Sequence, residues 1–396
     1  MTKPRALFVD DEPRILDGLR RSLRSKRGEW DMAFAGDGHE ALEVLGEAPY
    51  DVVVSDMRMP GMDGAELLTK VSKRHPEVAR VVLSGHIEPE AAFKVSVAGH
   101  RFLSKPSGAE SVISVIEQLL VRTSGSHQSE ARRIAGGVRA IPTLPEHTDG
   151  IMALLSPEAN LAYAVRTATL DVGLTAKLLQ LSNSRFFGSR PRNSSVESIV
   201  NAMGVSMVQA VAAAGQGLRP AEVWAPATER HLRMAWRHAV ATAYLVEAVA
   251  SPANRPHAQA AGLLQDVGRL ICLAAEGDQR PDVHLATTTI EGVPFRDVGV
   301  ELLHLWGVPP PIVIAVAQRD TPQQPHPAGL GVAAAVRTAH LLIQQTEFGD
   351  LSDGAHAEEL AVLLAHPQLK AQAIDWPGAA DAACRRAGLA TEPGIR

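Results

Sequence analysis

A short run of β-branched residues, Val52-Val-Val-Ser-Asp56, ends in an aspartate and is followed by the Pro60-Gly61 break. Such a run is typical of a buried strand that stops at the surface. We therefore expect this strand to carry the Asp56 carboxylate to one edge of a sheet. Two other apolar runs lead into charged residues, in the stretches Phe8–Asp11 and Phe102–Pro106, and we expect both stretches to meet Asp56 in space.

The first 121 residues alternate between strand-like and helix-like periodicity. The predicted strands are Arg5–Val9, Trp30–Ala35, Asp51–Ser55, Arg80–Leu83 and Arg101–Leu103. The predicted helices are Pro13–Arg24, Gly38–Leu45, Gly64–His75, Glu88–Ser96 and Ala109–Val121. This alternation predicts an α/β fold with a five-stranded, parallel, doubly wound sheet. Sheets of this kind bind ligands at the carboxyl ends of their strands.

Polar residues stand at the carboxyl ends of the predicted strands. In chain order they are Asp10, Asp11, Asp56, Ser84 and Lys105. Crowded carboxylates repel one another unless a cation neutralises them, and Mg²⁺ is a hard cation that prefers oxygen ligands. The ammonium of Lys105 and the hydroxyl of Ser84 suit the oxygens of a phosphoryl group. The pattern therefore favours a phosphate acceptor at Asp56.

This segment resembles the receiver domain of two-component response regulators. The resemblance rests on the acidic pair Asp10-Asp11, on Asp56 followed by Met-Arg-Met-Pro-Gly, on Ser84-Gly85 and on Lys105-Pro106. It implies that a histidine kinase transfers a phosphoryl group to Asp56, with Lys105 and Ser84 taking part in the reaction.

The same resemblance assigns two further roles. Asp10, Asp11, Asp56 and the backbone carbonyl of Arg58 would hold Mg²⁺, and Phe102 would be the switch aromatic. Each feature has an ordinary explanation when it is taken alone. An Asp-Asp pair before a helix is usually a cap, a Lys-Pro pair is usually a turn, and Phe102 can be a core residue of its strand.

The segment Arg122–Val138 lacks apolar periodicity and ends near Gly136-Gly137. We interpret it as a linker with room for one short helix. Its arginines, Arg122, Arg132 and Arg133, are expected to lie on a solvated face.

From residue 139 onward the periodicity is helical, and we expect an all-α domain. Predicted helices are Leu144–Leu155, Leu161–Thr169, Thr175–Asn183, Ser195–Met203, Ser206–Ala214, Leu232–Ala250 and Gln259–Leu273. This part resembles the HDOD domain, an all-α relative of the HD metal-dependent phosphohydrolases. The motifs that carry the resemblance are Ile141–Glu146, Asp171–Asn183, Phe186-Phe187-Gly188, Trp236-Arg-His238 and Gly262–Gly268. It covers residues 139–339, and we expect residues 340–396 to form a helical extension, which we leave unassigned.

The resemblance to HD hydrolases raises the question of a second metal site. His238 and Asp266 stand at two ligand positions of those enzymes, but Gln265 replaces the histidine of the His-Asp pair. Where a further histidine is expected, the chain has Gln318-Arg319. An amide oxygen is a poor ligand for a transition metal, so we expect His238 and Asp266 to form a buried, metal-free pair and the domain to be non-catalytic.

Charge and composition bear on the possible partners. The net charge is −5, made up of −1 up to residue 138 and −4 from residue 139 (20 Lys and Arg against 24 Asp and Glu). Neither part is basic, which disfavours nucleic acid as a partner. The absence of a long apolar run and the presence of two distant cysteines, Cys272 and Cys384, lead us to expect a cytoplasmic protein without membrane contact.

The sequence therefore predicts a receiver domain (1–121), a linker (122–138), an HDOD-like output domain (139–339) and an extension (340–396). The expected function is that of a phosphorelay response regulator whose output domain engages an unknown protein partner, with homodimer formation open. Two alternatives stay open: a divergent HD-type phosphohydrolase acting on a nucleotide or cyclic dinucleotide, and a DNA-binding regulator.

Overall fold

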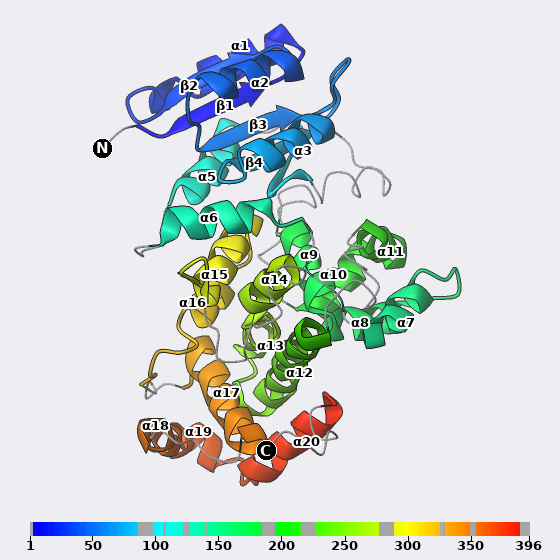
Figure 1. Ribbon diagram of the computed structural model, residues 1–396, viewed down its shortest axis with the longest axis vertical. Coiled ribbons are helices and arrows are strands. Elements are labelled where there is room, and N and C mark those ends of the chain that lie inside the picture. The colour runs from blue at the N-terminus through cyan, green and yellow to red at the C-terminus, as the bar shows by residue number, and fades with distance from the viewer. Residues whose placement is uncertain are drawn as a thin grey trace.

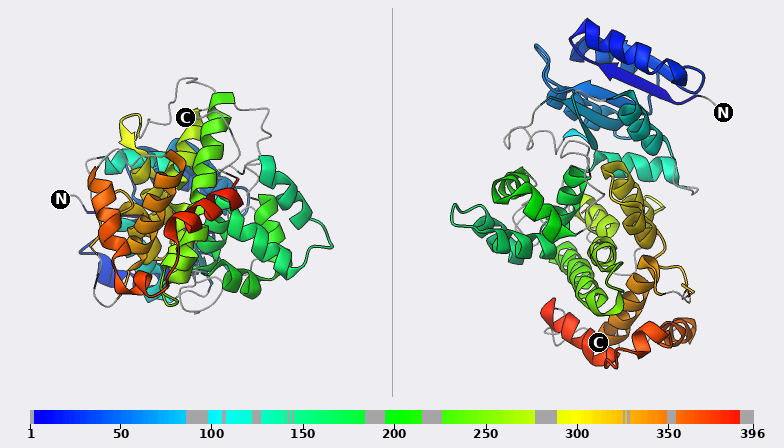
Figure 2. Two further views of the ribbon diagram at one scale, coloured as in Figure 1. Left: turned by 90° about the horizontal axis from the view of Figure 1, so that it is seen from below. Right: turned by 180° about the vertical axis from the view of Figure 1, so that it is seen from behind.

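The computed structural model describes residues 3–85, 98–105, 108–121, 127–139, 141, 143, 145–183, 195–214, 226–276, 289–324, 326, 329–348 and 354–388. An α/β part lies at one end of the molecule and a helical part at the other, with the C-terminal helices farthest from the sheet (Figure 1). Figure 2 shows the same arrangement from behind and from below. The predicted fold class, a doubly wound parallel sheet followed by an all-α region, is confirmed.

The α/β part is built on a five-stranded parallel sheet. Its strands are β1 (Arg5–Val9), β2 (Asp31–Ala35), β3 (Val52–Asp56), β4 (Ala79–Ser84) and β5 (Arg101–Ser104), in the order β2-β1-β3-β4-β5. This is the flavodoxin-like strand order. Val54 of β3 pairs with Phe8 of β1 on one side and with Val81 of β4 on the other. All five residues of β3 are buried, as its β-branched composition predicts.

Helices flank this sheet close to their predicted bounds. They are α1 (Pro13–Ser22), α2 (Gly38–Glu47), α3 (Gly64–Arg74) and α5 (Ala109–Leu120), and a 3-10 turn (Arg24–Lys26) follows α1. Asp37 and Asp63 cap α2 and α3 by accepting hydrogen bonds from backbone amides in the first turn. The predicted helix Glu88–Ser96 lies outside the described residues.

The interpreted linker contains helix α6 (Gln128–Gly137), which packs beside α3 and α15. The expectation that Arg132 lies on a solvated face is wrong. Its side chain is only 13% exposed, and Nη1 lies 2.9 Å from Glu301 Oε1 of the helical part. Arg132 also donates to the carbonyls of Leu119 and Glu77. Unpaired polar groups are costly to bury, and these three acceptors offset that cost. Arg122 lies outside the described residues.

The helical part follows the predicted periodicity over most of its length. Its helices are α7 (Pro145–Leu154), α8 (Leu161–Leu170), α9 (Val172–Ser182), α10 (Val196–Met203), α11 (Val205–Ala214), α12 (Pro226–Val249), α13 (Arg255–Leu264), α14 (Val267–Glu276), α15 (Phe295–Trp306), α16 (Pro310–Ala317), α17 (Val332–Phe348), α18 (Gly354–Leu364), α19 (Pro367–Lys370) and α20 (Trp376–Arg386). The motif Phe186-Phe187-Gly188 lies outside the described residues.

Two local features differ from the sequence prediction. The expected helix Gln259–Leu273 is two helices, α13 and α14, because the chain turns at Gln265-Asp266 and so carries Asp266 toward other helices. A small antiparallel hairpin, β6 (Thr289–Ile290) and β7 (Val293–Pro294), was missed. Its turn residues Glu291 and Gly292 have φ values of 50° and 80°, a conformation that favours glycine.

The C-terminal helices pack on the helical part and do not form a separate layer. Gln368 Nε2 donates to the carbonyl of Val249 at the end of α12, and the guanidinium of Arg386 lies 3.9 Å from the centre of the Tyr244 ring. The predicted boundary between residues 339 and 340 falls inside α17.

Within the described residues no single helix combines the length and apolar character of a membrane span. The pair Val196–Met203 and Val205–Ala213 passes such a test only jointly, across a bend of 105°.

The crossing of α14 and α15 depends on Gly268. A Cβ atom at this position would lie 1.8 Å from the carbonyl oxygen of Phe295, so the two helices would have to separate. We expect Gly268→Ala to lower the free energy of unfolding by about 1–3 kcal/mol, as overpacked cores do. Gly150→Ala is the control, because its Cβ would be 3.9 Å from Tyr163 Oη, an ordinary contact. Equal urea denaturation midpoints for the two variants would contradict this account.

Candidate functional site

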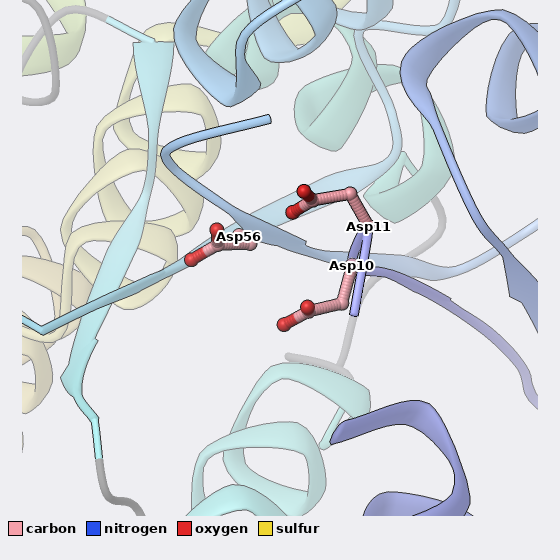
Figure 3. Close-up of side chains that lie close together, drawn as sticks. All are labelled: Asp10, Asp11 and Asp56. Atoms are coloured by element: carbon pink, nitrogen blue, oxygen red, sulfur yellow. The ribbon is translucent and has the colours of Figure 1, made fainter. Parts of the chain in front are cut away.

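Three carboxylates meet at the carboxyl edge of the sheet. Asp10 and Asp11 follow β1, and Asp56 is the last residue of β3. One oxygen from each of the three lies within 4.8 Å of the others, and Figure 3 shows the side chains pointing to the same side. Asp10 and Asp56 are buried, with 1% and 7% of their surfaces exposed, whereas Asp11 is accessible. Adjacent parallel strands place these residues together although they are far apart in the chain.

The backbone around Asp56 is held from both sides. The hydroxyl of Ser55 donates to the Asp56 carbonyl at 2.8 Å, and Met57 N donates to Leu83 O of β4 at 3.1 Å. Gly64, the first residue of α3, lies so close that a Cβ there would be 2.0 Å from the Asp56 carbonyl oxygen. This close approach fixes where Asp56 leaves the sheet.

Lys105 follows β5 and bridges two of the carboxylates. Its Nζ lies 2.7 Å from Asp10 Oδ2 and 2.7 Å from Asp56 Oδ1. Burial alone would lower the pKa of Lys105, but the hydrogen bonds and charges of Asp10 and Asp56 outweigh it and leave that pKa raised. The lysine is therefore a protonated cation at neutral pH, opposite three carboxylates.

The other predicted residues lie around the same edge. Arg58 N donates to Asp56 Oδ2 at 3.2 Å, so the Arg58 peptide is adjacent to the acidic cluster. Ser84 ends β4 and is buried, and its carbonyl accepts from Lys105 N at 2.7 Å. Phe102 is buried on β5, with its ring against Gly99: a Cβ on Gly99 would be 3.0 Å from Phe102 Cε1.

The acidic cluster fits Mg²⁺. One ammonium balances only one of the three carboxylate charges, which leaves an excess of negative charge and a set of hard oxygen donors. Asp10, Asp11 and Asp56 would hold the ion, and the Arg58 peptide is near enough to contribute. The bound ion would supply neutralising charge for phosphate oxygens.

The helical part contains a second polar cluster, around the turn between α13 and α14. His238 Nδ1 of α12 lies 2.6 Å from Asp266 Oδ2, and the Asp266 side chain is 4% exposed. Burial would raise the pKa of Asp266, but the charges of His238 and Arg319 outweigh it and hold that pKa far below its usual value. Asp266 is therefore ionised.

Arg319 supplies the second counter-charge to Asp266. Its Nη1 lies 2.6 Å from Asp266 Oδ1, while Nε and Nη2 donate to the two oxygens of Asp320 at 2.8 and 3.0 Å. The backbone of Arg319 is held in turn, because its carbonyl accepts from Arg337, whose guanidinium pairs with Glu359 of α18. An internal guanidinium thus neutralises the carboxylate that a metal would need.

Sequence reasoning did not identify His340 of α17 as a neighbour of His238. It is buried, and its ring centre lies 5.0 Å from that of His238 in an edge-on arrangement. Burial first, and then the charges of His238 and Arg319, lower the pKa of His340 well below its usual value. Gln265 points to α12, where its Nε2 donates to Thr242 Oγ1 at 2.7 Å. The helical spacing of α17 alone gives no sign of the contact between His340 and His238.

Two family models match the chain. The response regulator receiver domain matches residues 6–117, and the HDOD domain matches residues 141–322. The chain combines a response regulator receiver domain with an HDOD domain. The acidic cluster and Lys105 belong to the receiver domain, and the cluster around Asp266 belongs to the HDOD domain.

Curated relatives match the chain over limited lengths. The uncharacterized transcriptional regulatory protein YesN of Bacillus subtilis is 32% identical over 170 residues, which are 39% of this chain and 45% of that protein. The hydrogenase transcriptional regulatory protein HoxA of Cupriavidus necator is 36% identical over 114 residues, which are 28% of this chain and 23% of that protein. The chain thus spans less than half the length of these relatives.

Among solved structures, the chain is similar to the signal receiver domain of an HD domain-containing protein from Pseudomonas fluorescens Pf-5. The identity is 30%, and the match covers 30% of this chain and 95% of that one, with a TM-score of 0.29.

Removing the positive charge of the receiver site should tighten the binding of Mg²⁺. In Lys105→Met the three carboxylates lose the ammonium that repels an incoming cation, and the repulsion between one unit charge and Mg²⁺ at about 4 Å in a water-like medium is about 2 kcal/mol. We expect roughly thirtyfold tighter binding by isothermal titration calorimetry. Lys73→Met, an exposed position on α3, should leave the affinity unchanged. Weaker binding by Lys105→Met than by the wild type would show that the ion binds elsewhere.

Proposed function

We propose that this chain is a phosphorelay response regulator in which Asp56 accepts the phosphoryl group and the HDOD domain gives a non-catalytic output. The observation that carries the proposal is the convergence of Asp10, Asp11 and Asp56, of which Asp10 and Asp56 both pair with the ammonium of Lys105. This arrangement places a nucleophilic carboxylate beside a cation and beside two further carboxylates suited to Mg²⁺.

The transfer exchanges one bond to phosphorus for another. A carboxylate oxygen of Asp56 forms a bond to phosphorus while the P–N bond of a phosphohistidine on the kinase breaks. The imidazole nitrogen leaves with the electron pair and takes a proton from water, and Asp56 becomes an acyl phosphate. Lys105 keeps its proton and pairs with a phosphoryl oxygen, because its raised pKa holds it charged. The Ser84 hydroxyl donates a hydrogen bond to another oxygen.

The acyl phosphate carries about two negative charges in place of the single charge of the Asp56 carboxylate, so the site gains about one negative unit. Lys105 then pairs with the phosphoryl group, and strand β5, which immediately precedes Lys105, shifts between two arrangements. We assign Phe102 as the switch aromatic, since it is buried on β5 against Gly99 and must move with that strand. A bias of a few kcal/mol between the two arrangements is enough for a switch.

The output domain is proposed to act by binding a protein partner. The internal guanidinium of Arg319 on Asp266 disfavours the alternative of a divergent HD phosphohydrolase, because a metal would have to displace it. Gln265 offers an amide and no imidazole at the third position, and its Nε2 is engaged with Thr242. The proposed setting is the cytoplasm, with a histidine kinase as the phosphodonor and with homodimer formation open.

The phosphoacceptor assignment is tested with acetyl phosphate and Mg²⁺. The wild type should gain one acid-labile phosphoryl group by intact mass measurement, and Asp56→Asn should gain none, since an amide cannot form the acyl phosphate. Asp37→Asn is the matched control: it is an exposed cap of α2, where asparagine caps as well as aspartate. A phosphoryl gain that persists in Asp56→Asn would move the acceptor to another residue.

The metal-free state of the HDOD domain is tested by elemental analysis of the purified full chain. We expect Fe, Mn and Zn well below one equivalent per chain, and no change in His238→Ala, because Arg319 already neutralises Asp266. A stoichiometric metal that is lost in His238→Ala would establish a metal centre and favour the phosphohydrolase.

A further inference from the structure

Three basic side chains are buried together where the two domains meet. Arg80 of β4 and His100, which precedes β5, belong to the receiver domain, and both are 1% exposed. Lys177 of α9 belongs to the HDOD domain and is 4% exposed. Ionisable side chains are seldom buried this far, because a buried charge loses its hydration. The protonation states of these groups therefore bear directly on the stability of the contact between the domains.

The imidazole of His100 is enclosed by nitrogen donors of Arg80. The backbone N–H of Arg80 donates to His100 Nδ1 at 3.2 Å, and Arg80 Nη2 lies 2.7 Å from His100 Nε2. The same Nη2 donates to the carbonyl of Gly136 in α6 at 2.7 Å. Because a backbone N–H can only donate, Nδ1 is the accepting nitrogen, and the imidazole is neutral in this arrangement. A proton on Nδ1 would face the Arg80 N–H and break the hydrogen bond.

The backbone beside this imidazole is held by the HDOD domain. Gln180 Nε2 of α9 donates to the carbonyl of Gly99 at 3.0 Å and to the carbonyl of His100 at 3.1 Å. Lys177, one helical turn earlier, donates from Nζ to Gln180 Oε1 at 3.1 Å and so orients the amide. A displacement of His100 therefore moves both carbonyls that Gln180 binds.

The charges that act on His100 and Lys177 are mainly positive. Burial first, and then the charges of Arg80, Arg132 and Lys177, lower the pKa of His100 well below its usual value. Burial, and next the charge of Arg80, lower the pKa of Lys177 to about 7. Other charged or titratable groups of this contact are Arg101, Arg139, Glu301 and His304.

One neighbour of Lys177 favours the charged form. Its Nζ lies 4.0 Å from the centre of the Trp306 ring, and the face of an aromatic ring attracts a cation. This contact offsets part of the cost of burying an ammonium, whereas the like charge of Arg80 adds to that cost. The neutral amine can still donate to Gln180, so the contact does not require the charge.

We propose that the contact between the receiver and HDOD domains is proton-sensitive: it is closed by the neutral forms of His100 and Lys177, and protonation of either side chain weakens it. The proposal does not depend on phosphorylation of Asp56. When the domains separate, both side chains regain water and with it their ordinary affinity for protons. Closing the contact therefore releases protons, and acid favours separation.

The two groups act in different pH ranges. The pKa of Lys177 is about 7 in the closed contact and 10.5 in its ordinary state, so closing releases a proton between these values. The closing equilibrium should therefore become about fivefold more favourable from pH 7 to pH 8. The pKa of His100 is lowered from 6.5, so its contribution is present above that value and is lost as the pH falls below it.

The test replaces each group by a side chain that takes up no proton. His100→Asn places an acceptor near the position of Nδ1, and Lys177→Met keeps most of the length of the lysine without its charge. His39→Asn and Lys73→Met are the matched controls, because both positions are exposed in the receiver domain. All variants, including the one with both substitutions, are made in the full chain. Should His100→Asn fail to fold, Lys177→Met alone carries the test.

Small-angle scattering is recorded between about pH 5.5 and pH 8.5, with far-UV circular dichroism to verify that the helices stay folded. The radius of gyration of the wild type and of both controls should rise reversibly as the pH falls. The ratio of closed to open protein, from a two-state fit, should change about fivefold between pH 7 and pH 8 in the wild type and in His100→Asn but not in Lys177→Met. The variant with both substitutions should keep one radius throughout.

Nuclear magnetic resonance of histidine-labelled protein tests the closed form directly. His100 should carry its proton on Nε2 and should titrate below about 6.5. A proton on Nδ1 at neutral pH would overturn the role of His100.

Two scattering results would overturn the proposal as a whole. One is a radius of gyration of the wild type that does not change over this pH range. The other is a pH dependence that persists in the variant with both substitutions, which would place the proton-sensitive group elsewhere.

Discussion

The two ion pairs of Lys105 are the constraint on which the receiver site depends. Asp10 follows β1, Asp56 ends β3 and Lys105 follows β5, so one ammonium ties together three strands of the sheet. It balances only part of the negative charge, and the remaining carboxylate charge keeps the site receptive to a divalent cation. Loss of the strand order would scatter these groups and remove the electrostatic basis of the site.

Most of the receiver fold could be predicted because each strand and helix is indicated by the residues of its own short segment. Each strand is an apolar run of the right length, and parallel strands end at a common edge, so Asp10 and Lys105 could be brought together across 95 residues. Strand ends were accurate to a residue or two, since β-branched runs and Gly or Pro breaks bound them. Phe102 was harder to interpret, because a buried strand residue has the same pattern whether or not it moves.

The contacts that the sequence did not give are those of single charged residues with distant partners. Arg132 stands in a segment without periodicity, and nothing near it in the chain points to Glu301. Arg319 was recognised only as a departure from a histidine pattern, although it reaches Asp266 across 53 residues. His340 lies on an Ala-rich helix, where its burial follows from the packing of α12 and α17. Such pairs are determined by tertiary packing, and helical periodicity does not predict them.

The position of β5 gives the two domains a shared element. It is an edge strand of the sheet, and edges need cover because their backbone groups are otherwise open to pairing with other chains. Here the HDOD domain provides cover where β5 begins, through Gln180 and the backbone of His304. The same short strand is followed directly by Lys105, so the backbone that the HDOD domain covers is continuous with the residue that bridges Asp10 and Asp56.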